Sequence, residues 1–346
     1  MTAEVSVMNQ IGVALAADSA VTIGHDAKKI HTSADKLFQL TPQSSVGIMI
    51  YGNANFVGLP WETIIKTYRR NCADKTQKTI QAYADSFLVF LRKAKSLFPQ
   101  KDQDEAVEQL IFYHLLILRE QILKHLDDEA KKHPKGLAPT DVPKVVAAEI
   151  RDTLAAARKW KLINGFNKSV RNRIKKRYEP TVKGLRKRVF DKLPISASAS
   201  RNLASIVHEI LCREFFSPFE SGVVIAGFGD DEYLPSLIDF KMEQMTDSLP
   251  RYRLEGRTAI DADCTAAVTP FAQRDVVQAF MNGIQARLGD YMMQTTDDLF
   301  TGVVDAIIGA VTKRDKKLGQ ALSKTISPSV DKLKGQLFQD WQDRQH

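Results

Sequence analysis

Residues 2–22 read TAEVSVMNQIGVALAADSAVT, and this stretch decides the architecture expected of the N-terminal part of the chain. Apolar side chains alternate with others over residues 3–7, which is the pattern of a β-strand. Residues 11–17 form an almost continuous apolar run, as expected of a strand buried on both faces. Asn9 and Gln10 lie between the two segments and suit a turn, so the stretch predicts a β-hairpin.

Thr2 follows the initiator Met1, and this position gives the residue a distinct chemistry. Removal of Met1 would leave Thr2 with a free α-amine beside its own hydroxyl, which places a base and a nucleophile on one Cα. The amine has a reference pKa of about 8, so it can accept a proton near neutral pH. Folding the hairpin about its expected turn pairs Thr2 with Ala17 and brings the hydroxyl next to Asp18.

A second pair of strands is expected over residues 36–40 and 46–52. If this pair lies beside the hairpin, Lys36 enters the same site as Asp18. A lysine beside a buried carboxylate would help a threonine hydroxyl to lose its proton. Lys29 is the alternative lysine, but Lys36 keeps the better spacing to the strand at 46–52.

The N-terminal segment resembles the N-terminal-nucleophile (Ntn) hydrolases of the proteasome β-subunit type. The shared pattern is an N-terminal threonine, a strand ending in A-A-D-S, a threonine and a glycine, a lysine at a strand start, and a V-G-x-M-x-x-G strand. These elements are here Thr2, residues 16–19, Thr22, Gly24, Lys36 and residues 46–52. The segments VVIAGFG and PSLIDF, within residues 223–240, resemble a second motif of the same family. A strand over 251–260 and helices over 270–288 and 295–312 are expected to follow in the family order.

The resemblance implies a four-layer αββα sandwich of the α/β (α+β) class with an inserted helical subdomain. It implies Thr2 as the catalytic nucleophile, with Asp18 and Lys36 tuning its reactivity. It also implies that backbone N–H groups near Tyr51 and Gly52 stabilise the oxyanion of the reaction.

The activity implied by the resemblance is hydrolysis of peptide or amide bonds by a threonine peptidase that uses no cofactor and no metal. A peptide or protein substrate would pair as an extra strand with the backbone near Thr22 and Tyr51. Family members assemble into rings, so a homo-oligomer is expected, and an ATPase is a further candidate partner.

The resemblance divides the chain into discontinuous parts. Residues 1–98 and 216–312 correspond to one Ntn-hydrolase domain, residues 99–215 form a helical insertion, and residues 313–346 are a helical tail.

Within the insertion, apolar periodicity predicts a long helix over about 104–131 and a second helix that is capped by Asp141 and runs to about Leu162. Gly165 and Pro180 are expected to divide the next stretch, and Ser198 to cap the last helix.

The insertion carries most of the positive charge of the chain. Residues 131–192 hold 19 Lys and Arg against 5 Asp and Glu, whereas the whole chain has a formal net charge of +8. Three readings stay open for this segment: a solvated helical face, a surface for an acidic protein partner or neighbouring subunit, and nucleic-acid binding. Trp160, Phe166 and Tyr178 are too sparse for base stacking, so nucleic acid is the least favoured of the three.

Composition sets bounds on the class of protein. The three cysteines, Cys72, Cys212 and Cys264, are odd in number and lack metal-ligand spacing, which indicates a reducing compartment. No apolar run reaches the roughly 18 residues that would span a bilayer, and no signal peptide is evident, so a cytoplasmic location without membrane contact is expected. The seven histidines are scattered, and no metal site is expected.

A second function of a different class remains open, that of a catalytically weak or inactive proteasome-like scaffold whose basic insertion binds a partner. Residues 267–270 read AVTP where the family has a serine, and no closing pair of strands is evident near the C-terminus. Retention of Met1 would favour this scaffold.

Overall fold

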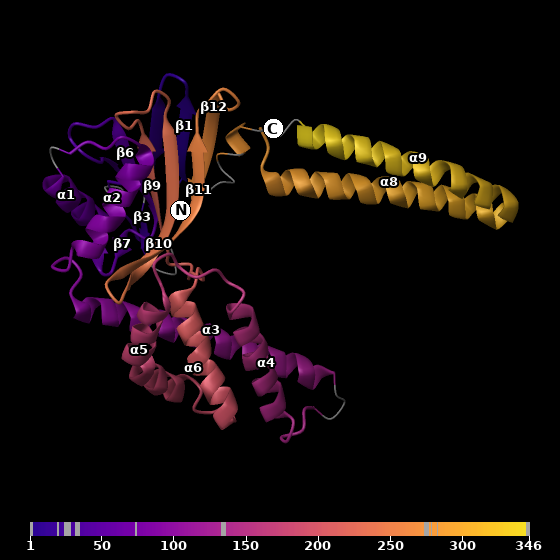
Figure 1. Ribbon diagram of the computed structural model, residues 1–346. Helices are drawn as coiled ribbons and strands as arrows, with labels where there is room; N and C mark the ends of the chain where they lie inside the picture. Colours follow the sequence, from indigo (N-terminus) through magenta and orange to yellow (C-terminus); the bar gives the residue numbers. More distant parts are fainter. Residues whose placement is uncertain are drawn as a thin grey trace. The chain divides into compact units, whose positions relative to one another are not determined.

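The computed structural model describes residues 3–18, 21–23, 29–31, 35–72, 75–132, 136–272, 277, 279–281 and 283–343 (Figure 1). The protein belongs to the mixed α+β class and contains several sheets. It divides into a large unit over residues 6–269 and a smaller unit formed by residues 3–5 and the C-terminal part from Pro270.

The large unit is built on a five-stranded antiparallel sheet in the order β11-β10-β9-β6-β5. The strands are β5 (Leu37–Gln39), β6 (Val46–Gly52), β9 (Ser221–Gly227), β10 (Ser236–Thr246) and β11 (Leu249–Ala259). Helices α1 (Trp61–Asn71) and α2 (Ile80–Lys93) share one apolar core with a face of this sheet. Along β6, Val46, Ile48 and Ile50 belong to that core, because alternate residues of a strand point to the same face.

The other face of the five-stranded sheet meets a second sheet, which has the order β12-β1-β2. Its strands are β1 (Ala3–Asn9), β2 (Val13–Ala17) and β12 (Ala266–Ala272). Strand β2 contacts both β5 and β6, and a Cβ added at Gly47 would lie 3.1 Å from a methyl of Leu15. Two short ribbons, β3 (Val21–Ile23) with β4 (Lys29–His31) and β7 (Asn55–Phe56) with β8 (Leu59–Pro60), complete the strands.

The N-terminal hairpin is present, but its turn lies one residue later than the sequence predicts. The N–H of Asn9 donates to the carbonyl of Gly12 at 3.0 Å, so Gln10 and Ile11 are the central residues. The side-chain oxygen of Asn9 accepts from the N–H groups of Ile11 and Gly12 at 2.9 and 3.0 Å, which makes Asn9 the first residue of the turn. The prediction that paired Thr2 with Ala17 assumed a turn centred on Asn9 and Gln10, and that strand register does not follow from the observed turn.

Strand β2 also differs from its prediction, because its residues alternate instead of being buried on both faces. Val13, Leu15 and Ala17 are half-buried, whereas Ala14 and Ala16 are exposed. A run of small apolar residues cannot by itself distinguish the two cases, since alanine is tolerated on either face.

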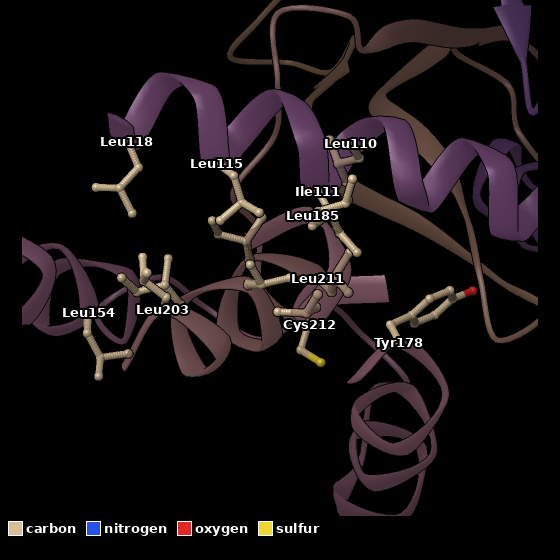
Figure 2. Close-up of a cluster of buried hydrophobic side chains, with 14 of the residues drawn as sticks. Leu110, Ile111, Leu115, Leu118, Leu154, Tyr178, Leu185, Leu203, Leu211 and Cys212 are labelled. Carbon is tan, nitrogen blue, oxygen red and sulfur yellow. The ribbon is translucent and has the colours of Figure 1, made fainter. Parts of the chain in front are cut away.

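A helical block made of α3 to α6 has its own apolar core within the large unit (Figure 2). Its helices are α3 (Gln100–Lys131), α4 (Val142–Ala157), α5 (Lys168–Val189) and α6 (Ala197–Cys212). Leu110, Ile111, Leu115 and Leu118 lie along α3 above side chains that include Leu203 and Leu211 of α6.

Three predictions about helix limits in this block are wrong. Helix α4 ends at Ala157, five residues before Leu162. Pro180 lies inside α5 and does not divide it. Burial of Tyr178, Val182 and Leu185 on the flanking turns stabilises the helix by more than the loss of one backbone hydrogen bond at proline destabilises it. Ser196, not Ser198, caps α6, and its Oγ accepts from the N–H of Ala199 at 3.1 Å.

A fully buried guanidinium joins the helical block to the sheet. Arg251 of β11 is 0% exposed, and its Nη1 donates to a carboxylate oxygen of Glu243 on β10 at 2.7 Å. Its Nη2 donates to three carbonyls at the end of α6 and just beyond it, those of Ile210, Arg213 and Phe215, at 2.9, 3.2 and 2.9 Å. The last carbonyls of a helix have no partner within the helix, so Arg251 supplies the carbonyl of Ile210 with a donor that α6 itself lacks.

The smaller unit contains two long helices that pair as a hairpin, α8 (Ala286–Arg314) and α9 (Lys316–Asp343). Asp315 forms the connection, and its carboxylate accepts from the N–H groups of Lys317 and Leu318 at 2.9 and 3.1 Å. Helix α8 begins nine residues before the expected start at 295. Strand β12 was not predicted, because the segment AAVTPFA holds a proline and few β-branched residues. The helix expected over 270–288 is therefore wrong at its start, where the strand runs to Ala272, and residues 283–285 are not helical either.

We expect Arg251→Met to lower the free energy of unfolding by about 3–5 kcal/mol, because it leaves the carboxylate of Glu243, 5% exposed, without its cation. The matched control is Arg257→Met on the same strand, where the side chain is exposed. Urea unfolding of both variants tests this expectation. Equal losses in the two variants would show that the buried pair is dispensable.

The stability of the fold should also depend on His114 of α3. Burial and the nearby charge of Arg251 lower the pKa of His114 to about 3, from an ordinary value of 6.5. Between these values the unfolded chain binds the proton and the folded chain does not, so stability falls as the pH falls through that window. Going from pH 7 to pH 5 should remove about 2 kcal/mol through this residue. Urea unfolding of His114→Phe at both pH values should show a smaller difference than the unchanged protein, and an identical difference would exclude the effect.

Candidate active site

An ion pair between Lys36 and Asp18 lies where one end of the three-stranded sheet meets the five-stranded sheet. The Nζ of Lys36 donates to Oδ1 of Asp18 at 2.7 Å, with the lysine side chain 10% exposed and the aspartate side chain 37% exposed. Asp18 directly follows β2, and Lys36 directly precedes β5. The pair therefore connects the two sheets through a charge-assisted hydrogen bond.

The backbone of Lys36 is anchored as firmly as its side chain. The N–H of Ile50 donates to the carbonyl of Lys36 at 2.9 Å, which extends the pairing of β5 with β6 by one step. This bond places Lys36 beside the end of β6, where Tyr51 and Gly52 follow. Three of the residues expected in the site, Lys36, Tyr51 and Gly52, thus come from two adjacent strand ends.

The backbone at Gly52 has a conformation that only glycine adopts readily. Its φ is +77°, and a Cβ at this position would lie 2.6 Å from the carbonyl oxygen of Glu220. The N–H of Asn53 donates to that same carbonyl at 3.2 Å. The end of β6 therefore turns in a fixed way immediately beyond Tyr51.

The buried side chain of Tyr51 reaches from β6 across β9 to β10. Tyr51 is opposite Gly222 in the register of β6 and β9, and a Cβ on Gly222 would lie 1.9 Å from the tyrosine ring. The hydroxyl contacts both oxygens of Asp239 on β10, at 3.0 and 2.8 Å, and the Nζ of Lys241 lies 4.2 Å from the ring centroid. Gly222 thus leaves space for the ring, and the carboxylate of Asp239 and the ammonium of Lys241 fix its position.

Glu220 continues this polar network toward β11. Its carboxylate lies 3.5 Å from the Nζ of Lys241 and 3.4 Å from a guanidinium nitrogen of Arg253. Burial raises the pKa of Glu220, although the two cations act in the opposite direction.

The structure brings together some of the predicted site residues and leaves others undescribed. Asp18 and Lys36 form an ion pair, and Tyr51 and Gly52 follow Ile50, which is hydrogen-bonded to Lys36. Thr22 pairs with Ile30 in the β3–β4 ribbon, and its side chain is not described. Thr2 lies outside the described residues. The side chain of Lys29, the alternative lysine, is not described either.

Two charged residues near this site were missed by sequence reasoning. Asp239 and Lys241 lie two residues apart in β10, whose sequence SLIDFKMEQMT reads as an apolar strand interrupted by charges. Charges at alternate positions of such a strand share one face, so this spacing was the available signal. Their partner, Tyr51, is 188 positions from Asp239 in the sequence, which no local pattern reveals.

Within the described part of the chain, no group of three or more His, Cys, Asp or Glu side chains is arranged to hold a metal ion. None of the described helices has the length and apolarity needed to cross a membrane. Comparison of the chain with models of known protein families gave no match, and comparison with curated proteins gave none either.

Tyr51→Phe should lower the free energy of unfolding by about 1–3 kcal/mol, because it deprives the buried carboxylate of Asp239 of a hydroxyl donor. Tyr233→Phe is the matched control, since Tyr233 is 96% exposed. Chemical unfolding of the two variants provides the measurement. If both changes prove neutral, the hydrogen bond does not stabilise the sheet.

Proposed function

We propose that the protein is an N-terminal threonine hydrolase that cleaves peptide or amide bonds, with Thr2 as nucleophile once Met1 has been removed. The observation that carries the proposal is the 2.7 Å ion pair of Lys36 and Asp18, which lies at the junction of two sheets and beside the end of β6. The pair joins the two charged residues that the sequence singled out for one catalytic site.

The proposed reaction proceeds through an acyl-enzyme. The Oγ of Thr2 attacks the substrate carbonyl, and its proton passes through water to the α-amine of the same residue and then to the leaving amine as the C–N bond breaks. The ammonium of Lys36 favours the deprotonated hydroxyl, and Asp18 keeps that ammonium in place. Water then hydrolyses the ester and restores Thr2.

Backbone groups supply the remaining parts of the proposed mechanism. N–H groups near Tyr51 and Gly52 stabilise the oxyanion, and the constrained φ of +77° at Gly52 supports a fixed direction for them. The substrate pairs as an added strand with backbone near Thr22 and Tyr51.

The same proposal includes the four-layer αββα sandwich. Three layers support it: the helix layer of α1 and α2, the five-stranded sheet that shares their core, and the second sheet, whose β2 contacts β5 and β6. The fourth layer of helices, and assembly into a homo-oligomer with or without an ATPase, are part of the proposal and rest on the family resemblance.

A scaffold function is the second candidate, and the charge on α5 favours it. Arg173 and Arg177 form ion pairs with Asp247 and Asp104. Five lysines of the same helix are exposed and have no ion-pair partner among the described residues: Lys168, Lys175, Lys176, Lys183 and Lys187. Such a helix suits an acidic protein partner through charge complementarity.

Replacing the nucleophile tests the first candidate directly. Thr2→Ala should abolish hydrolysis of fluorogenic peptide amides, because it removes the attacking oxygen alone, and Thr2→Ser should keep part of the activity. Thr295→Ala, an exposed threonine of α8, is the control and should leave turnover unchanged. Undiminished turnover in Thr2→Ala would place the chemistry elsewhere. An intact mass that includes Met1 in purified protein would favour the scaffold instead.

A further inference from the structure

A pocket of about 450 Å³ lies in the large unit, between α3 and the ends of β6 and β10. Its size falls within the range of small-molecule sites in proteins. One stripe of α3 forms a wall of the pocket, namely Ala106, Gln109, Leu110 and Tyr113 at helical spacing. The rest of the lining consists of Asn53, Asn55, Val57, Gly58, Ser217, Phe219, Glu243 and Gln244.

One residue that lines this pocket, Gln244, carries a buried donor without a partner. Gln244 is 4% exposed, and its Nε2 makes no hydrogen bond with any described residue. An unsatisfied buried amide is costly, so such a group is expected to find an acceptor in a ligand or in water.

The other lining residues indicate what kind of ligand would supply that acceptor. Asn55 and Gln109 also present carboxamides that are not hydrogen-bonded through their side chains to described residues, and each carboxamide both donates and accepts. The rings of Tyr113 and Phe219 meet edge to face at 5.2 Å and form an apolar wall.

The lining offers no free charge to a ligand. Among the described residues of the lining none is a cation, and their single carboxylate, that of Glu243, is already engaged. One of its oxygens accepts from Arg251 at 2.7 Å, and the other accepts from the N–H of Ser217 at 2.7 Å. The pocket is therefore suited to an uncharged ligand.

The wall opposite α3 has a strained backbone. Val57 has a φ of +52° and Gly58 a φ of +78° in the turn between β7 and β8. A β-branched residue in the left-handed region is an outlier, and such strain persists only where surrounding structure fixes it. Val57 is 7% exposed within the core of α1 and α2, so the shape of this wall is set before any ligand arrives.

We propose that this pocket binds an uncharged peptide segment by one apolar side chain and its adjoining amide. The apolar side chain packs against Tyr113, Phe219 and Leu110, and the amide carbonyl accepts from the Nε2 of Gln244. The carboxamides of Asn55 and Gln109 take up the remaining amide donor and acceptor. The proposed binding does not depend on catalysis by Thr2.

The test is an NMR titration of the full chain with three probes: N-acetyl-leucinamide, N-acetyl-lysinamide and the amide of N-acetylglutamate. We expect the leucine probe to bind at least ten-fold more tightly than either charged probe, because the lining has no group to pair with a charge. Gln244→Met should weaken leucine-probe binding about five-fold through the loss of one hydrogen bond. Ala106→Trp should abolish it by filling the pocket. The matched control is Gln121→Leu, an exposed glutamine further along α3, which should not change the affinity.

Several results would overturn the proposal. One is equal affinity for all three probes, and another is unchanged binding to Ala106→Trp with its thermal unfolding midpoint preserved. If Gln244→Met does not fold, Ala106→Trp decides alone, because Ala106 is only partly buried, beside the core that α1 and α2 share with the sheet. Binding should survive Thr2→Ala, and its loss in that variant would assign the probe to the catalytic site instead.

Discussion

The buried guanidinium of Arg251 is the constraint on which the relation between the helical block and the sheet depends. Transferring such a cation into the interior is unfavourable unless its charge and donors are matched. Here a carboxylate and three carbonyls match the charge and the two terminal nitrogens, whereas Nε has no hydrogen-bond partner among the described residues. Because those carbonyls lie at the end of α6 and just beyond it, and the carboxylate belongs to β10, the interaction holds the end of the helical block in one orientation. The same Glu243 lines the pocket beneath α3, so the shape of that pocket follows from how Arg251 is satisfied.

The five-stranded sheet has two chemically different faces: one packs in an apolar core, and the other carries polar and charged side chains. The face toward α1 and α2 is apolar and closely packed with aromatic side chains. The other face carries Tyr51, Asp239 and Lys241, whose polar groups satisfy one another across three neighbouring strands. Near the latter face Lys36 also meets Asp18. The charges on this side have polar partners: Asp239 accepts from the Tyr51 hydroxyl, and Lys36 pairs with Asp18. The apolar core on the opposite side buries the other face of the strands.

Local patterns were sufficient for some elements and insufficient for others. Apolar alternation and glycine spacing identified β6 and β9, and the distance of Lys36 from the glycine strand selected the lysine that contacts Asp18. The hairpin turn was predicted one residue too early. Its position depends on hydrogen bonds from the N–H groups of Ile11 and Gly12 to the side-chain oxygen of Asn9, which composition alone does not reveal. Pro180 was misread because tertiary packing outweighs its local penalty. The contact of Tyr51 with Asp239 joins strands that only the assembled sheet brings together, so sequence spacing carries no trace of it.

Strand order has a consequence for how the chain is made. Strand β6 ends at Gly52, and its partner β9 begins at Ser221, with the whole helical block in between. At ribosomal speeds of about 5–20 residues per second, β6 waits roughly 10–30 s for the strand that completes its ladder. The helices between them rest on local contacts, which form far sooner than strand pairs distant in sequence. During synthesis one edge of β6 therefore stays unpaired for several seconds, with only β5 and the early helices beside it. Folding of the helical block in that time brings the end of β6 closer to the start of β9 and lowers the entropy cost of pairing the two strands.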